Sequence, residues 1–192
     1  MSKDDLPGRQ RRSIRLPGWD YSTPASYFLT LVTFQRECLF GEIMDGRMVL
    51  SPIGRIAEEH WCLIPQHFPG VELGAHAILP NHVHGIIMIR SDMAFVGATH
   101  EAVGATHWVA PTTGTTGPAR PNGPKRGSIG AIVGAYKMSV TRRIERECDR
   151  ANIWQRNYYE HIIRDNEAYK RISWYIETNV ENWAADEENP VK

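Results

Sequence analysis

Two histidines separated by one apolar residue form the most informative chemical pattern in this chain. The stretch PNHVHGI at positions 80–86 leads directly into the apolar run of residues 86–89. Such β-branched runs are typical of strands, in which residues i and i+2 point to one face. His82 and His84 would then lie side by side, with Val83 packed behind them. Two imidazoles so placed can hold one divalent metal ion, although exposed strand histidines without a ligand are the plainer alternative.

A second set of polar residues lies near the C-terminus, on a helix that we predict from Asp165 to Trp183. Asp165 is a suitable N-cap, and apolar residues recur at spacings of three and four along one stripe. The neighbouring stripe carries a guanidinium, a phenol and two amides, from Arg171, Tyr175, Asn179 and Asn182. Tyr175 and Asn179 are one turn apart, so both can reach the same bound atom. The alternative for Tyr175 is a structural position at the edge of the core.

Together these segments resemble the HUH motif family of single-tyrosine transposases, and most closely the REP-associated tyrosine transposases. LPNHVHGI at 79–86 is similar to the histidine motif, and IWQRNYYEHIIR at 153–164 is similar to a second block. YIETN at 175–179 resembles the helix that carries the nucleophile of this family. The blocks follow in family order, and the likeness covers about residues 20–183.

The resemblance implies that His82 and His84 are two metal ligands, that Asn179 is the third ligand, and that Tyr175 is the nucleophile. Many members of the family have Asn-Pro where this chain has Asn179-Val180. A proline would end the helix there, so we expect the helix of this chain to continue for another turn. This departure affects the assignment of Asn179 more than the other three.

The order of strand and helix patterns predicts the fold class. Strands are expected at 27–34, 71–79, 82–89 and 153–158, helices at 51–67, 128–147 and 165–183, and a hairpin turn at Asp45-Gly46. This order indicates an α+β fold with an antiparallel sheet and helices packed on one face. The family resemblance implies the same ferredoxin-like arrangement.

Composition divides the chain into a basic N-terminal arm (1–20), one transposase-like domain (21–183) and an acidic tail (184–192). A low-complexity insertion at 91–127 interrupts the domain, and we expect it to be flexible. Within it VGATHEA is followed by VGATHWV. This duplication explains the spacing of His100 and His107 without a metal site.

The cellular setting follows from the cysteines and the hydropathy. The chain has 192 residues, 42% of them hydrophobic, enough for one domain with a core. Three cysteines without metal-type spacing are typical of reduced thiols in a cytoplasmic protein. No apolar run approaches the roughly 20 residues of a membrane span, and we expect neither a signal peptide nor membrane association.

Net charge is zero, with 22 basic and 22 acidic residues, but the charges are unevenly distributed. Arginines crowd the N-terminal arm, and seven basic residues accompany only one acid between Arg120 and Arg146. Such clusters can follow a phosphate backbone, although they can also be merely solvated. The expected DNA-binding residues are Arg9, Arg11, Arg12, Arg15, Lys137, Arg142, Arg143, Tyr158, Tyr159 and Arg171.

The resemblance implies an enzyme that cleaves and rejoins single-stranded DNA near hairpins through a 5′-phosphotyrosine intermediate. Two imidazoles and an amide suit Mg²⁺ or Mn²⁺, and the imidazoles favour Mn²⁺. Tyr158 and Tyr159 are rival nucleophiles without an amide one helical turn away. The alternatives are a metal-dependent phosphodiester hydrolase without a covalent intermediate and a non-catalytic protein that binds hairpin nucleic acid. Whether the protein is a monomer or a homodimer is left open.

Overall fold

A four-stranded antiparallel sheet with the order β4-β5-β1-β6 is the centre of the computed structural model, which describes residues 16–90 and 124–190. The strands and helices are β1 (Ala25–Val32), η1 (Phe34–Arg36), β2 (Gly41–Met44), β3 (Arg47–Leu50), α1 (Pro52–Cys62), α2 (Ile64–His67), β4 (Val71–Leu79), β5 (His82–Ile89), α3 (Ile129–Cys148), β6 (Tyr159–Ile163), α4 (Asn166–Thr178) and η2 (Trp183–Ala185). Most of the predicted arm and insertion, with Arg9, Arg11, Arg12, Arg15, His100 and His107, lies outside the described residues.

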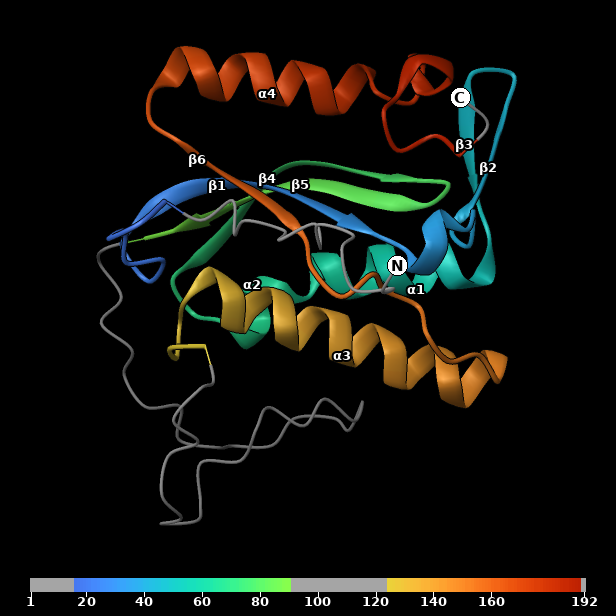
Figure 1. The fold of residues 1–192 in the computed structure, drawn as a ribbon, viewed down its shortest axis with the longest axis horizontal. Helices are drawn as coiled ribbons and strands as arrows, with labels where there is room; N and C mark the ends of the chain where they lie inside the picture. Colours follow the sequence, from blue (N-terminus) through green and yellow to red (C-terminus); the bar gives the residue numbers. More distant parts are fainter. Residues whose placement is uncertain (1–15, 91–123, 191–192) are drawn as a thin grey trace, which may run out of the picture.

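The predicted α+β class with an antiparallel sheet is confirmed, but the helices cover both faces of the sheet rather than one. Helices α1, α2 and α3 lie on one face, and α4 lies alone on the other (Figure 1). The residues of β5 show why. Val83 and Ile87 belong to the larger core with α1 and α3, whereas Ile86 packs with Ile176 of α4. A strand that is apolar on both sides needs a cover on each side.

The starts of the three long helices follow the local sequence. Ser51 and Ser128 accept hydrogen bonds through Oγ from the third residue of α1 and α3, at 3.0 and 3.3 Å. Asp165 does the same for α4 at 2.7 Å. Each cap satisfies a backbone N–H that has no partner within the helix, which is worth about 1 kcal/mol.

The last strand of the sheet is not the one that the sequence predicts. Residues 153–158 form only an isolated bridge between Trp154 and Thr33, and the strand is β6, which pairs with β1. Lys137 of α3 explains the difference. Its Nζ donates to the carbonyl oxygens of Gln155 and Asn157 at 3.0 and 3.2 Å. The predicted strand is therefore tied to a helix before the chain enters the sheet.

The tyrosine-bearing helix also ends earlier than predicted. We expected it to reach Trp183, but α4 ends at Thr178 although no proline follows. The backbone N–H of Asn179 bonds the carbonyl oxygen of Ile176 in a tighter turn, and Asn182 bonds the carbonyl oxygen of Thr178 through both its backbone and its side chain. The short turn sends the chain back toward the sheet.

Gly85 fixes the packing behind the two histidines. A Cβ atom on this residue would overlap the indole ring of Trp61, which is fully buried in α1. The indole can approach β5 this closely only because position 85 has no side chain. The strand that carries His84 is thereby held directly against α1.

We predict that Gly85→Ala lowers the free energy of unfolding by about 1–3 kcal/mol, because the added methyl forces Trp61 or β5 to move. Urea denaturation followed by tryptophan fluorescence measures this change. The matched control is Gly134→Ala in α3, where an added Cβ meets nothing within 4 Å. That substitution should stabilise the protein by about 0.5–1 kcal/mol. Equal stabilities for the two variants would contradict the packing argument.

Candidate active site

His82 and His84 lie next to each other on the face of β5 that α4 covers. Their ring centroids are 4.4 Å apart, and both side chains are buried. Val83 between them is fully buried in the core on the opposite face. The period-two alternation of a strand thus gives the paired arrangement that the sequence predicts.

Hydrogen bonds orient both imidazole rings. Nδ1 of His82 lies 2.9 Å from Oδ1 of Asn81, and Nδ1 of His84 lies 3.0 Å from Oγ1 of Thr30. Thr30 is available because the β1–β5 register pairs it directly with His84. In each ring Nδ1 is therefore engaged, and Nε2 remains for other contacts. Such outer partners fix the orientation and basicity of metal-binding histidines.

Burial keeps both histidines neutral. Desolvation, with smaller effects of His84 and Arg36, lowers the pKa of His82 to about 2. Burial also lowers the pKa of His84 to about 4, despite the opposing charge of Asp186. Neutral imidazole is the form that binds metal ions, so both rings are in the ligand state at neutral pH.

Asp186 completes a group that could hold a metal ion. One oxygen of its carboxylate and one nitrogen of each histidine all lie within 4.8 Å of one another, and all three residues are buried. The carboxylate is held by Asn179 Nδ2, which donates to Oδ2 at 3.1 Å, and by the Glu188 N–H, which donates to Oδ1 at 2.7 Å. Two imidazoles and a carboxylate are a common donor set for divalent transition metals.

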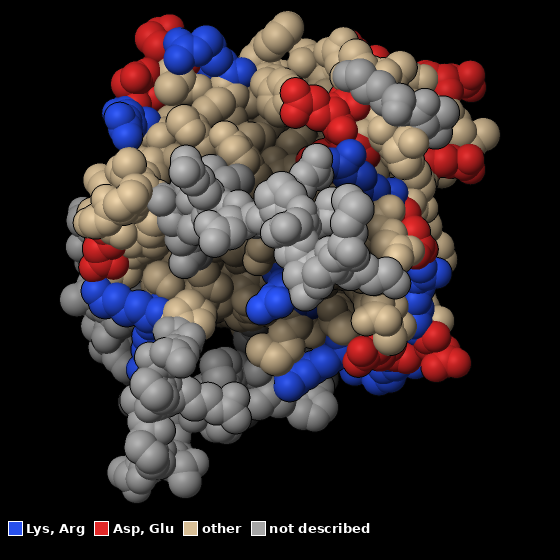
Figure 2. Space-filling model, viewed as in Figure 1, with Lys and Arg blue, Asp and Glu red and all other residues tan. Residues whose placement is uncertain are grey.

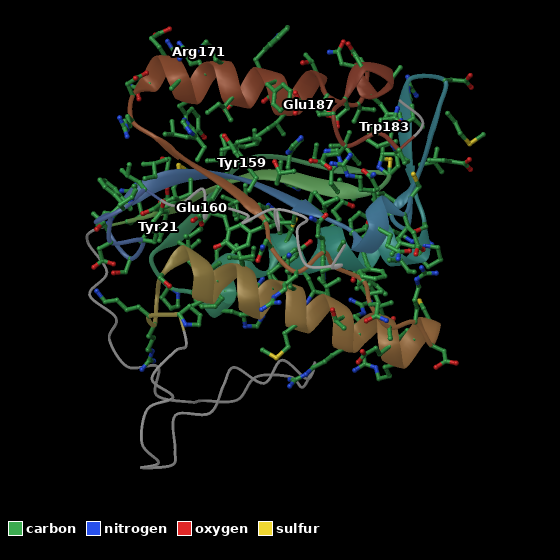
Figure 3. All side chains as sticks on the ribbon, in the orientation of Figure 1. Tyr21, Tyr159, Glu160, Arg171, Trp183 and Glu187 are labelled. Carbon is green, nitrogen blue, oxygen red and sulfur yellow. The ribbon has the colours of Figure 1, made fainter. Side chains whose placement is uncertain are left out.

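Sequence reasoning missed Asp186 because it treated residues 184–192 as an acidic tail. Folding of this segment against the sheet depends on the early end of α4, for which the sequence offers no proline or glycine signal. Figure 3 shows Trp183 and Glu187 beyond the C-terminal end of α4, on the side of the sheet that this helix covers. The ring of Trp183 lies 5.8 Å from that of His82.

Asn179 reaches the same group, but its contact is with Asp186. The residue is 2% exposed, and its Oδ1 has no hydrogen-bond partner among the described residues. Nε2 of His82 is buried and equally unpartnered there. Two acceptor atoms without donors beside a carboxylate fit a bound cation, because a buried acceptor left unpaired costs about 1–3 kcal/mol. The predicted role of Asn179 as a ligand stays a prediction.

Tyr175 projects from α4 toward the histidine pair. Its hydroxyl lies 3.3 Å from Nε2 of His84, and the side chain is 43% exposed. Burial and the negative charge of Asp186 raise the pKa of the phenol, while a hydrogen bond with Asn179 lowers it. The phenol is therefore protonated at neutral pH and is open to a large substrate.

The two rival tyrosines lie on opposite faces of the sheet. Tyr159 is 41% exposed, and its ring lies 6.1 Å from that of Phe28, which is also 6.2 Å from the ring of Tyr175. Tyr158 packs against the core on the α3 side, where Nζ of Lys137 lies 5.8 Å from its ring centroid. Of the two, only Tyr159 shares the face of Tyr175.

The predicted basic residues of α3 are not part of this site, because α3 lies across the sheet from Tyr175 (Figure 1). Lys137 is turned inward onto two backbone carbonyls, and its burial lowers its pKa to about 8. Arg143 forms ion pairs with Glu59 and Glu147. Arg142 is exposed on the same helix. Their predicted role as phosphate contacts stays a prediction.

Arg171 lies on the exposed surface of α4, as Figure 3 shows. The described charges on the face in Figure 2 are mixed, with blue and red side chains interspersed. None of the helices in the described part of the chain is long and apolar enough to cross a membrane.

Comparison with solved structures identifies the fold. The chain matches the REP-associated tyrosine transposase bound to a REP hairpin with a TM-score of 0.51 and 17% identity, over 81% of this chain. The match spans 66% of the transposase, just under two thirds of its length. The resemblance inferred from the motifs is thus confirmed at the level of the fold. A second structure, of a candidate transposase from Deinococcus radiodurans R1, covers 85% of this chain but has a TM-score of only 0.42 and 16% identity.

Sequence comparison identifies the family. No family model matches the chain. An uncharacterised protein of Haemophilus influenzae is 36% identical over 177 residues, which is 92% of each chain. The chain belongs to the same protein family as this Haemophilus protein.

We predict that Asp186→Asn weakens Mn²⁺ binding by at least about tenfold, because it removes the only negative charge of the group. Calorimetric titration of the metal-free protein measures the affinity. The control is Glu187→Gln, which removes the same charge from an exposed neighbour. An unchanged affinity in Asp186→Asn, or equal losses in both variants, would exclude Asp186 from the metal site.

Proposed function

We propose that the protein is a metal-dependent transposase or endonuclease that cleaves and rejoins single-stranded DNA at hairpins, with Tyr175 as the nucleophile. The observation that carries this proposal is the position of the Tyr175 hydroxyl, 3.3 Å from Nε2 of His84 and beside the group of His82, His84 and Asp186. A nucleophile next to a cation site is what phosphodiester cleavage requires.

In the proposed reaction the Tyr175 oxygen attacks a backbone phosphorus, and the bond from that phosphorus to the 3′ oxygen breaks. The phenolic proton passes to water through the exposed side of the ring, and the departing 3′ oxygen takes a proton from water. The products are a 5′-phosphotyrosine and a free 3′-hydroxyl. One ester replaces another, so a 3′-hydroxyl can reverse the step or join a new strand without ATP. A divalent cation, Mn²⁺ or Mg²⁺, would polarise the phosphate and offset the Asp186 charge that raises the pKa of Tyr175.

The chain's own residues supply the other functions. His82, His84 and Asp186 would hold the cation, with Asn179 as a further oxygen ligand at its unpartnered Oδ1. Asn179 also bonds the phenol and lowers its pKa, so it favours the attacking form of the nucleophile.

Substrate recognition is proposed on two observations. The matched transposase was solved with a REP hairpin, which supports hairpin DNA as the substrate class. Tyr159 presents an exposed ring on the face of the nucleophile, where an unpaired base could stack for about 1–3 kcal/mol. Phosphate contacts are proposed for Arg171 and Arg142 and for Arg9, Arg11, Arg12 and Arg15 of the N-terminal arm.

We predict that Tyr175→Phe abolishes both the covalent adduct and strand cleavage. The substitution removes one oxygen and its hydrogen bonds with His84, Asn179 and Asp186 at a partly exposed position, so stability should change by no more than about 2 kcal/mol. The assay incubates a labelled hairpin oligonucleotide with protein and Mn²⁺ and reads the adduct on a denaturing gel.

The matched control is Tyr159→Phe, which changes the other exposed tyrosine of this face and should retain the adduct. An adduct that survives in Tyr175→Phe would assign the nucleophile to another residue. Cleavage without any adduct in the wild type and in Tyr175→Phe would instead make the protein a hydrolase.

A further inference from the structure

We propose that Asn81 is a positioning residue that organises the group of His82, His84 and Asp186 from outside it. Asn81 would fix the proton of His82 on Nδ1 and would also hold the C-terminal segment that carries Asp186. The inference rests on the proposed function only in treating this group as a metal site. Its structural content concerns Asn81 alone and can be tested without activity.

The amide of Asn81 has one possible orientation. The residue is fully buried in the turn between β4 and β5. Its Nδ2 donates to the carbonyl oxygen of Arg36 at 3.1 Å and to that of Glu188 at 2.7 Å. Carbonyl oxygens cannot donate, so the NH₂ group must face them. The Oδ1 atom therefore faces His82.

This orientation determines the tautomer of His82. Oδ1 of Asn81 lies 2.9 Å from Nδ1 of His82 and is only an acceptor. A neutral imidazole with an acceptor at Nδ1 carries its hydrogen there, which leaves a lone pair on Nε2. Nε2 is the buried atom without a hydrogen-bond partner among the described residues. The carbonyl oxygens of Arg36 and Glu188 thus fix the orientation of the Asn81 amide. That orientation leaves Nε2 of His82 able to act as a ligand.

The same amide positions Asp186. The carbonyl of Glu188 is bonded to Asn81, and the N–H of Glu188 donates to Oδ1 of Asp186 at 2.7 Å. Arg36 strengthens this attachment, because its Nε pairs with the Glu188 carboxylate at 3.1 Å. Asn81 and Glu188 are 107 positions apart in sequence. One side chain therefore connects the two parts of the chain that meet at the site.

Two substitutions separate the two functions of the amide. In Asn81→Asp a carboxylate still accepts from Nδ1 of His82 but cannot donate to Arg36 or Glu188. The tautomer should be kept, and the C-terminal segment should loosen. In Asn81→Leu both functions are lost. The control is Asn157→Asp, the same change at an exposed asparagine outside the site.

The first measurement is the tautomer of His82 in the metal-free protein at neutral pH, by ¹⁵N NMR of the imidazole, with His82→Gln used for assignment. Wild type, Asn157→Asp and Asn81→Asp should all carry the hydrogen on Nδ1, and Asn81→Leu should show a mixture. A hydrogen on Nε2 in the wild type, or an unchanged tautomer in Asn81→Leu, would overturn the inference.

The second measurement is hydrogen exchange at the Glu188 amide. Loss of the Asn81 bond should speed exchange about tenfold in both Asn81 variants and leave the Asn157→Asp control unchanged. Mn²⁺ affinity should fall about 10- to 100-fold in Asn81→Leu. Unchanged exchange in Asn81→Asp would overturn the inference even if Asn81→Leu fails to fold. Absence of DNA cleavage in the wild type, with both NMR results as expected, would reject the proposed function and leave this inference standing.

Discussion

Strand β5 is buried on both faces, and the positions of all the site residues depend on this constraint. Its alternation directs Val83 and Ile87 into the core with α1 and α3, and His82 and His84 under α4. A shift of the strand by one residue would exchange the two sets and bury imidazoles in the apolar core. The large apolar area under α1 and α3 therefore stabilises the register that pairs the histidines. The absence of a side chain at Gly85, against Trp61, reinforces it.

The cost of this arrangement is the desolvation of two imidazoles, and it is limited by keeping them neutral. The pKa of His82 is lowered to about 2 and that of His84 to about 4, so neither ring is charged at neutral pH. Their Nδ1 atoms are paired with Asn81 and Thr30. Only the Nε2 sides remain, and they face α4 and the C-terminal segment. The fold thus directs the Nε2 atoms of both histidines to the same region beneath α4.

The sequence was sufficient where short-range periodicity decides the structure. The strands around Pro80-Asn81, the capped helices and the histidine pair all follow from spacings of two, three and four residues. The prediction was wrong where the structure is determined by a side chain that is distant in sequence. Lys137 binds backbone carbonyls of residues 153–158 and holds them against α3. The hydrogen bond between Asn179 and Asp186 brings Asp186, from the predicted acidic tail, into the site. Clusters of arginine and lysine could not be placed because linear order does not say which layer a helix occupies.

The Nε2 atom of His84 connects Tyr175, the proposed nucleophile, to the rest of the site. The hydroxyl of Tyr175 lies 3.3 Å from this atom, and Nδ1 of the same ring is engaged by Thr30. A cation bound at Nε2 would take the place of this contact. Occupation of the group by a cation would therefore release the phenol from His84 and leave it with Asn179, which lowers its pKa, and Asp186, which raises it. In the proposed reaction, filling of the site would therefore change the hydrogen-bond partners of the Tyr175 oxygen. Helix α4 ends at Thr178, one residue before Asn179. Tyr175 and Asn179 therefore reach the group of His82, His84 and Asp186 from a single turn of the chain.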